Sequence, residues 1–273
     1  MGARFEIVVA AMASSCAAEP ADACEACADL IEDWHDRLSV FDPASEVSRL
    51  NARAGFAAAP VARDLFDLLT RCEQYREQTG GAFDIGVGAL MAARGFRGEE
   101  PGGARAALTL DPDGKSARID PADASIDLGG VAKGFVIDLC LAEMRELGVD
   151  SALIHGGTST AGALGAPPGQ DAWRVRVAGT SEVIALRDNA MSVSAPSGRT
   201  IDGAGHVLDP QRDGAPACGV RTAWCTGTSA EATDAYATAM VVTGNAAAPD
   251  GYAGGLVRDN EQETDAYGTA RSA

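Results

Sequence analysis

The chain has 273 residues, of which 46% are hydrophobic and 5% aromatic, and its formal net charge is −17 with a pI near 4.5. This length and apolar content allow one large or two small globular domains with a substantial core. The excess of acidic residues disfavours nucleic acid and anionic lipid as general partners, because both would be repelled. An anionic substrate would need a metal ion or local cations in order to bind.

The predicted elements alternate between strands and helices without a clean linker. In chain order we expect a strand at 4–11, helices at 22–37 and 62–79, a Gly-, Glu- and Arg-rich loop at 95–106, a helix at 132–147, a buried strand at 151–155, short strands within 173–208, and a last helix that begins at a capping box from Thr228 to Glu231. This pattern predicts an α+β fold with one composite domain over residues 1–252. Residues 253–273 are polar, and we expect a loosely held tail.

The cysteines and the absence of visible targeting patterns indicate which cellular compartment to expect. Seven cysteines are scattered through a chain too large to need disulfide staples, which favours reduced thiols. Cys24 and Cys27 form a C-x-x-C, but they share helical spacing with Leu30 and Trp34, so we interpret them as buried helix positions, with metal ligands as the alternative. No segment approaches the ~18 apolar residues of a membrane span, and no signal peptide or lipid-anchor pattern is visible. We expect a cytoplasmic protein without membrane insertion.

A glycine-rich junction, D-L-G-G-V-A-K-G at 127–134, stands where a strand is expected to pass into a helix. Adjacent glycines let a ligand approach the backbone closely, and a helix N-terminus offers N–H donors and partial positive charge to phosphate. Lys133 adds a full charge. Many such turns serve packing alone, so the motif by itself leaves both phosphate or flavin binding and plain packing open.

Asp234 and Thr238 are four residues apart in T-D-A-Y-A-T-A and therefore share one face of the last predicted helix. Their neighbours are mostly Ala and Met, so Asp234 is expected to be buried, which is costly for an uncompensated carboxylate. A carboxylate and a hydroxyl suit Mg²⁺, which takes few protein ligands and completes its shell with water and substrate phosphate. The spacing alone also allows Thr238 to bond its own helix and Asp234 to pair with an arginine.

Three histidines are present. His206, in G-H-V-L-D-P at 205–210, is a candidate general base, and a structural hydrogen-bonding histidine is the alternative. His155, before a glycine pair, is a second candidate, whereas His35 is expected at a helix surface.

Six segments in order resemble the FAD:protein FMN transferase family, the ApbE-like flavinyltransferases. They are M-G-A-R-F at 1–5, L-S-V-F-D-P-A-S-E-V-S-R-L-N at 38–51, T-G-G-A-F-D-I at 79–85, D-L-G-G-V-A-K-G at 127–134, H-V-L-D-P at 206–210 and T-D-A-Y-A-T-A at 233–239. The resemblance runs through nearly the whole chain. It implies an ApbE-like, T-fold-related architecture: a single composite domain of mixed or antiparallel sheets with flanking helices.

The resemblance also implies an enzyme that binds FAD, cuts its pyrophosphate with Mg²⁺ and joins FMN to a Thr or Ser hydroxyl of an acceptor protein, releasing AMP. By the same resemblance, Mg²⁺ would be bound by the Asp234 and Thr238 side chains and by the Gly130 carbonyl, and Asp234 would be catalytic. His206 is the candidate base for the proton of the acceptor hydroxyl. The expected FAD contacts are Met1, Phe41 under the flavin ring, Ala82, Phe83, Asp84, Asp127, Lys133 and the backbone of Leu208.

Two segments depart from the family pattern. Thr158 and Ser159 follow the glycine pair at 156–157, where the family usually has Asp or Glu, and S-A-P-S-G stands at 194–198 in place of A-T-S-G. Both lie where flavin or acceptor recognition is expected. Two alternatives therefore accompany FMN transfer: a Mg²⁺-dependent FAD pyrophosphatase that yields FMN and AMP, and a non-catalytic flavin-binding protein.

Overall fold

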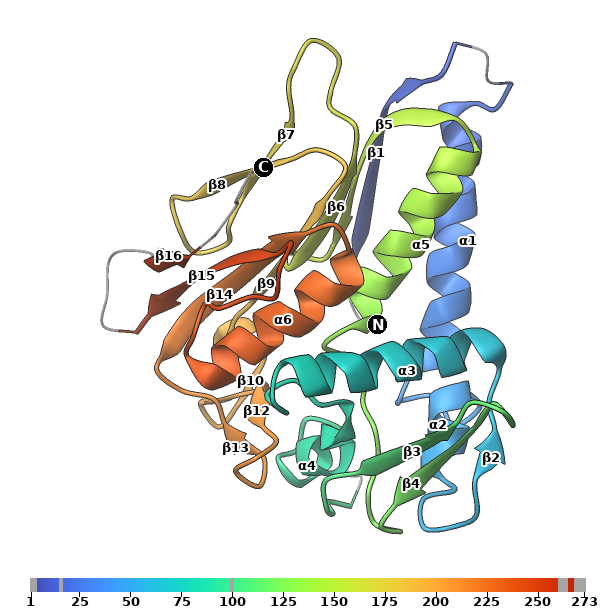
Figure 1. Ribbon diagram of the computed structural model, residues 1–273, viewed down its shortest axis with the longest axis vertical. Coiled ribbons are helices and arrows are strands. Elements are labelled where there is room, and N and C mark those ends of the chain that lie inside the picture. Colours follow the sequence, from blue (N-terminus) through green and yellow to red (C-terminus); the bar gives the residue numbers. More distant parts are fainter. Residues whose placement is uncertain (1–3, 15–16, 99–100, 260–264, 268–273) are drawn as a thin grey trace.

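The largest sheet carries the helices that bring the expected site residues together (Figure 1). The computed structural model describes residues 4–14, 17–98, 101–259 and 265–267. Within those residues the sheet has seven strands in the order β1-β5-β6-β9-β14-β15-β16, and each neighbouring pair is antiparallel. The bounds are Phe5–Met12 for β1, Val149–Gly156 for β5, Thr160–Leu164 for β6, Ala190–Ser194 for β9, Val220–Gly227 for β14, Ala253–Arg258 for β15 and Asp265–Tyr267 for β16.

Three helices, α1 (Pro20–Leu38), α5 (Ala132–Glu146) and α6 (Ala230–Thr243), gather on one side of this sheet. Helix α5 packs on β5 and β6, α6 packs on β9 and β14, and α1 lies against α5. Trp34 of α1 meets Phe135 of α5 edge to face, with ring centroids 4.6 Å apart. Helix α6 is buried around most of its circumference, which its many alanines allow because they let neighbouring backbones come close.

A hairpin of β7 (Trp173–Arg176) and β8 (Val183–Leu186) covers the opposite face of the sheet. Successive strand residues point to opposite faces. Ala190 and Cys225 accordingly pack in the core on the helix side, whereas Met191 and Trp224 pack in the smaller core under the hairpin. The even-numbered residues of β9 therefore point toward α6.

The residues between α1 and α5 form a smaller unit, drawn below the main sheet in Figure 1, with a three-stranded sheet in the order β2-β4-β3. An ion pair ties this unit to α6, since Arg71 Nε lies 2.8 Å from Glu231 Oε1. Its elements are α2 (Glu46–Asn51), β2 (Ala59–Pro60), α3 (Arg63–Gln78), the 3-10 turn η1 (Ile85–Val87), α4 (Gly88–Ala93), β3 (Ala107–Asp111) and β4 (Ser116–Asp120). Short elements also follow β9: η2 (Pro196–Gly198), β10 (Thr200–Ile201), β11 (Ala204–Gly205), β12 (Leu208–Asp209) and β13 (Ala215–Pro216).

The predicted fold class, an α+β domain with antiparallel sheets and flanking helices, is confirmed. The helices expected at 22–37, 62–79 and 132–147 are α1, α3 and α5, with ends close to the predicted bounds. The strands expected at 4–11 and 151–155 are β1 and β5. Among the helices of the described residues, none combines the length and apolar character that crossing a membrane requires.

The expected boundary at residue 252 is corrected, because Ala253–Arg258 forms β15 inside the main sheet. The segment contains two glycines that suit this position. A Cβ atom on Gly254 would lie 2.5 Å from the Met240 side chain, and one on Gly255 would lie 2.7 Å from the Trp224 ring. The sheet thus continues into the segment that the sequence predicted as a polar tail.

The start of α6 also differs from the prediction. Ser229, not Thr228, is the N-cap residue, and its hydroxyl accepts a hydrogen bond from the Ala232 N–H at 3.1 Å. Glu231 does not reach back to complete a capping box, because its carboxylate is paired with Arg71. Thr228 therefore lies before the N-cap, and Glu231 pairs with Arg71 instead of the N-cap backbone.

Candidate functional site

A cleft of about 860 Å³ gathers segments that are far apart in the chain. It is bordered by the end of α1, the loop before α4, the glycine-rich junction before α5, the loops around 157–159 and 193–210, and the face of α6 that carries Asp234 and Thr238. Met1 lies outside the described residues. The other expected site residues all line the cleft: Phe41, Ala82, Phe83, Asp84, Asp127, Gly130, Lys133, His206, Leu208, Asp234 and Thr238.

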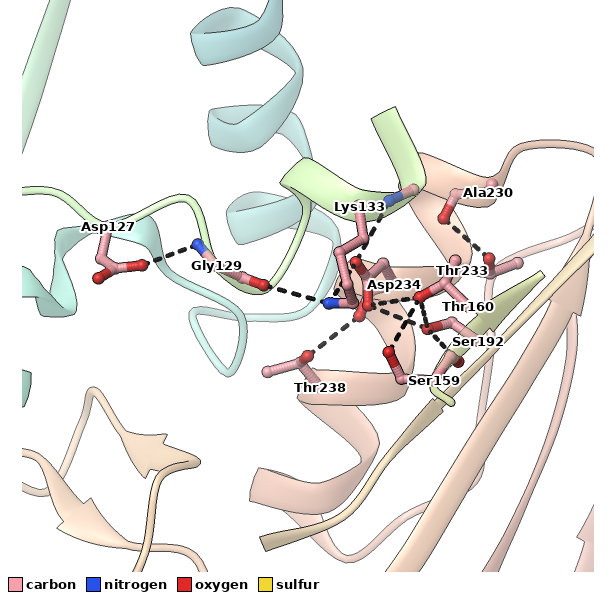
Figure 2. Close-up of polar contacts among 11 residues, drawn as sticks. Asp127, Gly129, Lys133, Ser159, Thr160, Ser192, Ala230, Thr233, Asp234 and Thr238 are labelled. Carbon is pink, nitrogen blue, oxygen red and sulfur yellow. Dashed lines mark hydrogen bonds and ion pairs between the residues drawn. The ribbon is translucent and has the colours of Figure 1, made fainter. Parts of the chain in front are cut away.

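The Asp234 residue is almost fully buried, at 4% exposure, and hydrogen-bond donors face both oxygens of its carboxylate (Figure 2). Oδ1 faces two hydroxyls, Ser192 Oγ at 2.9 Å and Thr160 Oγ1 at 3.4 Å. Oδ2 faces Lys133 Nζ at 3.3 Å and the backbone N–H of Gly134 at 3.4 Å. A buried carboxylate needs such compensation, and the cationic partner is a lysine where the sequence left an arginine open.

The glycine-rich junction directs Lys133 toward Asp234. Asp127 Oδ1 accepts a hydrogen bond from the Gly129 N–H at 2.7 Å, which closes a tight turn, and the Gly129 carbonyl accepts one from Lys133 Nζ at 3.4 Å. Gly134, one residue further, allows the close approach of α5 to α6, since a Cβ atom there would lie 2.1 Å from the Ala230 carbonyl oxygen. The ammonium group therefore contacts both a loop carbonyl and the buried carboxylate.

The three expected metal ligands lie in one corner of the cleft. The Thr238 hydroxyl donates to the Asp234 carbonyl at 3.0 Å, which is the helix back-bond that the sequence left open. A Cβ atom on Gly130 would lie 3.6 Å from Thr238 Oγ1, so the glycine and the threonine are neighbours across the corner.

The donor chemistry of this corner fits Mg²⁺. The described residues hold no group of three or more His, Cys, Asp or Glu side chains arranged for a metal. The corner instead offers one carboxylate, one hydroxyl and backbone carbonyls, all oxygens, which suits a cation that completes its shell with water and phosphate. Placement of the Lys133 ammonium against the carboxylate and the loop carbonyl also marks the corner as favourable to positive charge.

His206 contacts backbone carbonyl groups through one ring nitrogen, Nδ1. Its Nδ1 lies 3.2 Å from the Arg199 carbonyl oxygen and 3.4 Å from that of Pro196. Two acceptors on Nδ1 assign the proton to that nitrogen, which leaves Nε2 with its lone pair. Burial lowers the pKa of His206 below its usual 6.5, and the charges of Lys133 and Arg199 lower it further, so the neutral ring prevails at pH 7.

The other two histidines are not part of the cleft. His155 lies on β5, paired with Glu6 of β1, and burial lowers its pKa. His35 is half-buried on α1, where the sequence predicted a surface position. Of the three, His206 alone is a cleft residue.

Two expected FAD-contacting residues differ sharply in their surroundings. Phe41 is 64% exposed at the rim of the cleft, which is unusual for a large apolar ring. The Asp84 carboxylate is already engaged, because it accepts from the Gly86 N–H at 2.7 Å and from Arg105 Nη1 at 2.6 Å. Phe41 thus offers a free ring face, whereas Asp84 shapes the loop that borders the cleft.

Thr160 and Ser192 were missed by the sequence analysis. They stand on neighbouring strands, paired with each other in register, and are 1% and 0% exposed. Neither belongs to a recognisable motif. The available signal was a hydroxyl in an otherwise apolar buried strand, because such a group needs a partner.

The comparisons with known proteins agree with this fold and cleft. The family model described as "ApbE family" matches residues 1–255. An FAD:protein FMN transferase of Rhodobacter capsulatus is 28% identical over 239 residues, which cover 78% of this chain and 44% of that protein. One of Treponema pallidum (strain Nichols) is 30% identical over 162 residues, which cover 50% of this chain and 43% of that protein. The matches thus span less than half the length of these two curated relatives.

Solved structures match over almost the full length. The flavin transferase ApbE from Vibrio cholerae has a TM-score of 0.82 at 19% identity and covers 98% of this chain and 94% of its own. The ApbE protein of Thermotoga maritima has a TM-score of 0.81 at 22% identity and covers 93% of this chain and 91% of its own. These likenesses concern the fold. With the family model matched over residues 1–255, this chain belongs to the ApbE family.

Proposed function

We propose that this chain is an FAD:protein FMN transferase, which moves FMN from FAD to a Thr or Ser hydroxyl of an acceptor protein and releases AMP. The observation that carries the proposal is that one cleft contains both the Asp234 corner and the His206 ring. A volume of about 860 Å³ is in the range of sites for large small-molecule ligands. Relatives that bear this name are similar in sequence to much of the chain.

Binding of FAD would use both ends of the cleft. The exposed ring of Phe41 suits stacking against the flat flavin. Lys133 and the N-terminal end of α5 suit the diphosphate, because they provide a full positive charge and the positive end of the helix dipole. Mg²⁺ held by Asp234, Thr238 and the Gly130 carbonyl would supply charge neutralisation on the diphosphate.

The transfer step needs one base and one leaving group. His206 Nε2 accepts the proton of the acceptor hydroxyl, whose oxygen then bonds to the phosphorus of the FMN half. The bond from that phosphorus to the bridging oxygen breaks, and AMP leaves with the electron pair. Phosphoryl transfer requires of the protein mainly positioning and charge stabilisation, which suits a cleft that the described residues line with a single histidine.

The test separates transfer from its two alternatives by their products. Protein, FAD and Mg²⁺ are incubated with and without a pooled set of peptides that each contain one Thr or Ser, and AMP, FMN and peptide masses are measured. Transfer predicts AMP together with FMN-bearing peptide, and little AMP without peptides. AMP and free FMN in both samples would indicate a pyrophosphatase, and bound yellow flavin without either product would indicate a flavin-binding protein.

A further inference from the structure

Two hydroxyls from the sheet converge on one oxygen of Asp234 (Figure 2). Thr160 of β6 and Ser192 of β9 are cross-strand partners, and both side chains lie on the face that α6 covers. Their oxygens are 3.0 Å apart, and both groups are shielded from water. The seven-stranded sheet therefore contacts the candidate metal ligand through a matched pair of polar side chains in an otherwise apolar layer.

The number of protons that Thr160 and Ser192 can donate limits the hydrogen bonds they can form. Each hydroxyl has a single proton to donate. Ser192 is best placed to give its proton to Asp234 Oδ1 at 2.9 Å, compared with 3.2 Å to the Ser159 carbonyl oxygen. Thr160 can then donate to Ser192 Oγ at 3.0 Å or to Asp234 Oδ1 at 3.4 Å. In the first arrangement Thr160 polarises the Ser192 hydroxyl, which itself donates to the carboxylate, and in the second both hydroxyls donate directly to Oδ1.

The Asp234 carboxylate is held from two sides, by the sheet and by α5. Oδ1 is held by hydroxyls from the sheet, while Oδ2 faces Lys133 Nζ and the Gly134 N–H from α5. Rotation of the carboxylate about its Cβ–Cγ bond would break contacts on both sides at once. Without the hydroxyls, only the α5 side would resist this rotation.

We infer that Thr160 and Ser192 are positioning residues that orient the Asp234 carboxylate for a divalent cation and set the affinity of the corner for it. This inference rests on the metal-binding part of the proposed function. Hydrogen-bond partners of metal ligands fix the ligand geometry, and their loss costs about 10–100-fold in metal affinity. Ser192 contributes more than Thr160, because its contact with Oδ1 is shorter.

The chain offers a matched control in Thr233. This residue is also fully buried and directly precedes Asp234, but its hydroxyl donates to the Ala230 carbonyl at 2.9 Å. Thr233→Val removes a buried hydroxyl from the same helix without touching the contacts of the carboxylate. Thr160→Ser serves as the rescue variant, since it keeps the hydroxyl and loses only a methyl group.

The experiment is a titration of the full chain with Mn²⁺ alone, followed by the EPR signal of the free ion, with urea unfolding to show that each variant is folded. We expect Ser192→Ala to weaken Mn²⁺ binding about 10–100-fold and Thr160→Val to weaken it less. Thr160→Ser and Thr233→Val should bind as the unmodified chain does.

The outcomes separate this inference from the proposed function. Unchanged Mn²⁺ affinity in Ser192→Ala, or an equal loss in Thr233→Val, overturns the positioning role while the metal site stands. Failure of the unmodified chain to bind Mn²⁺ overturns the metal site itself, and the positioning role with it.

Discussion

The Asp138 carboxylate of α5 accepts a hydrogen bond from the Ser229 hydroxyl at 2.7 Å, at the point where α6 begins. It also accepts from the backbone N–H groups of Ala230 at 2.8 Å and Glu231 at 3.0 Å. A carboxylate at a helix N-terminus satisfies orphan donors and complements the helix dipole. This contact joins the helix that carries Lys133 to the helix that carries Asp234.

Replacement of Asp138 should therefore destabilise the fold. Asp138→Ala removes the acceptor of three donors at the end of a buried helix, and a hydrogen bond to a charged group contributes about 1.5–3 kcal/mol net of its exchange with water. We expect a loss of about 2–4 kcal/mol in the free energy of unfolding, measured by urea titration. Asp29→Ala, at an exposed position of α1, is the control and should change little. Equal effects of the two substitutions would contradict the capping role.

Lys133→Met should affect cation and flavin binding in opposite directions. The ammonium lies 3.3 Å from Asp234 Oδ2, so it repels a divalent cation near that oxygen and attracts a diphosphate. We expect tighter Mn²⁺ binding in the absence of flavin and about 10–100-fold weaker FAD binding, the latter corresponding to one lost charged contact. Mn²⁺ titration and quenching of flavin fluorescence measure the two affinities. If the Mn²⁺ affinity and the FAD affinity both fall, Lys133 acts mainly by stabilising the corner through its ion pair with Asp234.

Phe41→Ala should weaken FAD binding without a large change in stability. The ring is 64% exposed at the cleft rim, so its removal costs little in the folded protein but takes away a stacking surface for flavin. Phe56→Ala is a close control, because Phe56 is 65% exposed and is not among the cleft residues. Fluorescence titration with FAD should separate the two variants. If both bind FAD equally well, Phe41 does not contact the flavin.

The pH dependence of turnover should follow the protonation of His206. Burial lowers the pKa of this histidine from 6.5, so the base is in its active neutral form at pH 7 and is lost as pH falls through the lowered value. The rate of AMP release should rise with pH on the acid side, with a midpoint below pH 6.5, and then level off. His206→Gln should lower the rate about 10²–10⁴-fold and remove that acid limb.

The same shift has a consequence for stability. A histidine with a lowered pKa in the folded state contributes stability above its unfolded pKa of 6.5, and this contribution disappears as pH falls through the folded value. Urea titrations at pH 7 and pH 5 should therefore show a smaller loss of stability in His206→Gln than in the unmodified chain. An identical loss in both would contradict the lowered pKa.

Local patterns predicted much of the fold and the cleft. The spacing of Leu and Trp residues in α1 and α3, and the four-residue separation of Asp234 and Thr238, depend on helix geometry that neighbouring residues determine. Ordered motifs placed Lys133 and His206 at the same site, and both line the cleft.

Tertiary contacts set the features that local patterns did not reveal. Thr160 and Ser192 meet only because two strands pair in one register, and that register follows from packing of the whole sheet. The cap of α6 is Ser229 because Asp138, far away in the chain, lies against that turn. Strand β15 was missed because residues 253–273 are polar as a whole, although the strand at their start is largely buried. Its two glycines fit against Met240 and Trp224.

The most direct test of the proposed activity is AMP formation from FAD as a function of Mg²⁺ concentration, in the unmodified chain and in Asp234→Asn, with the acceptor peptides present. Asn keeps the shape of the side chain but removes the charge that a hard cation requires. The proposal predicts AMP release that saturates with Mg²⁺, stops with a chelator and is absent in Asp234→Asn at every Mg²⁺ concentration. Full AMP release by Asp234→Asn, or release unaffected by the chelator, would contradict it.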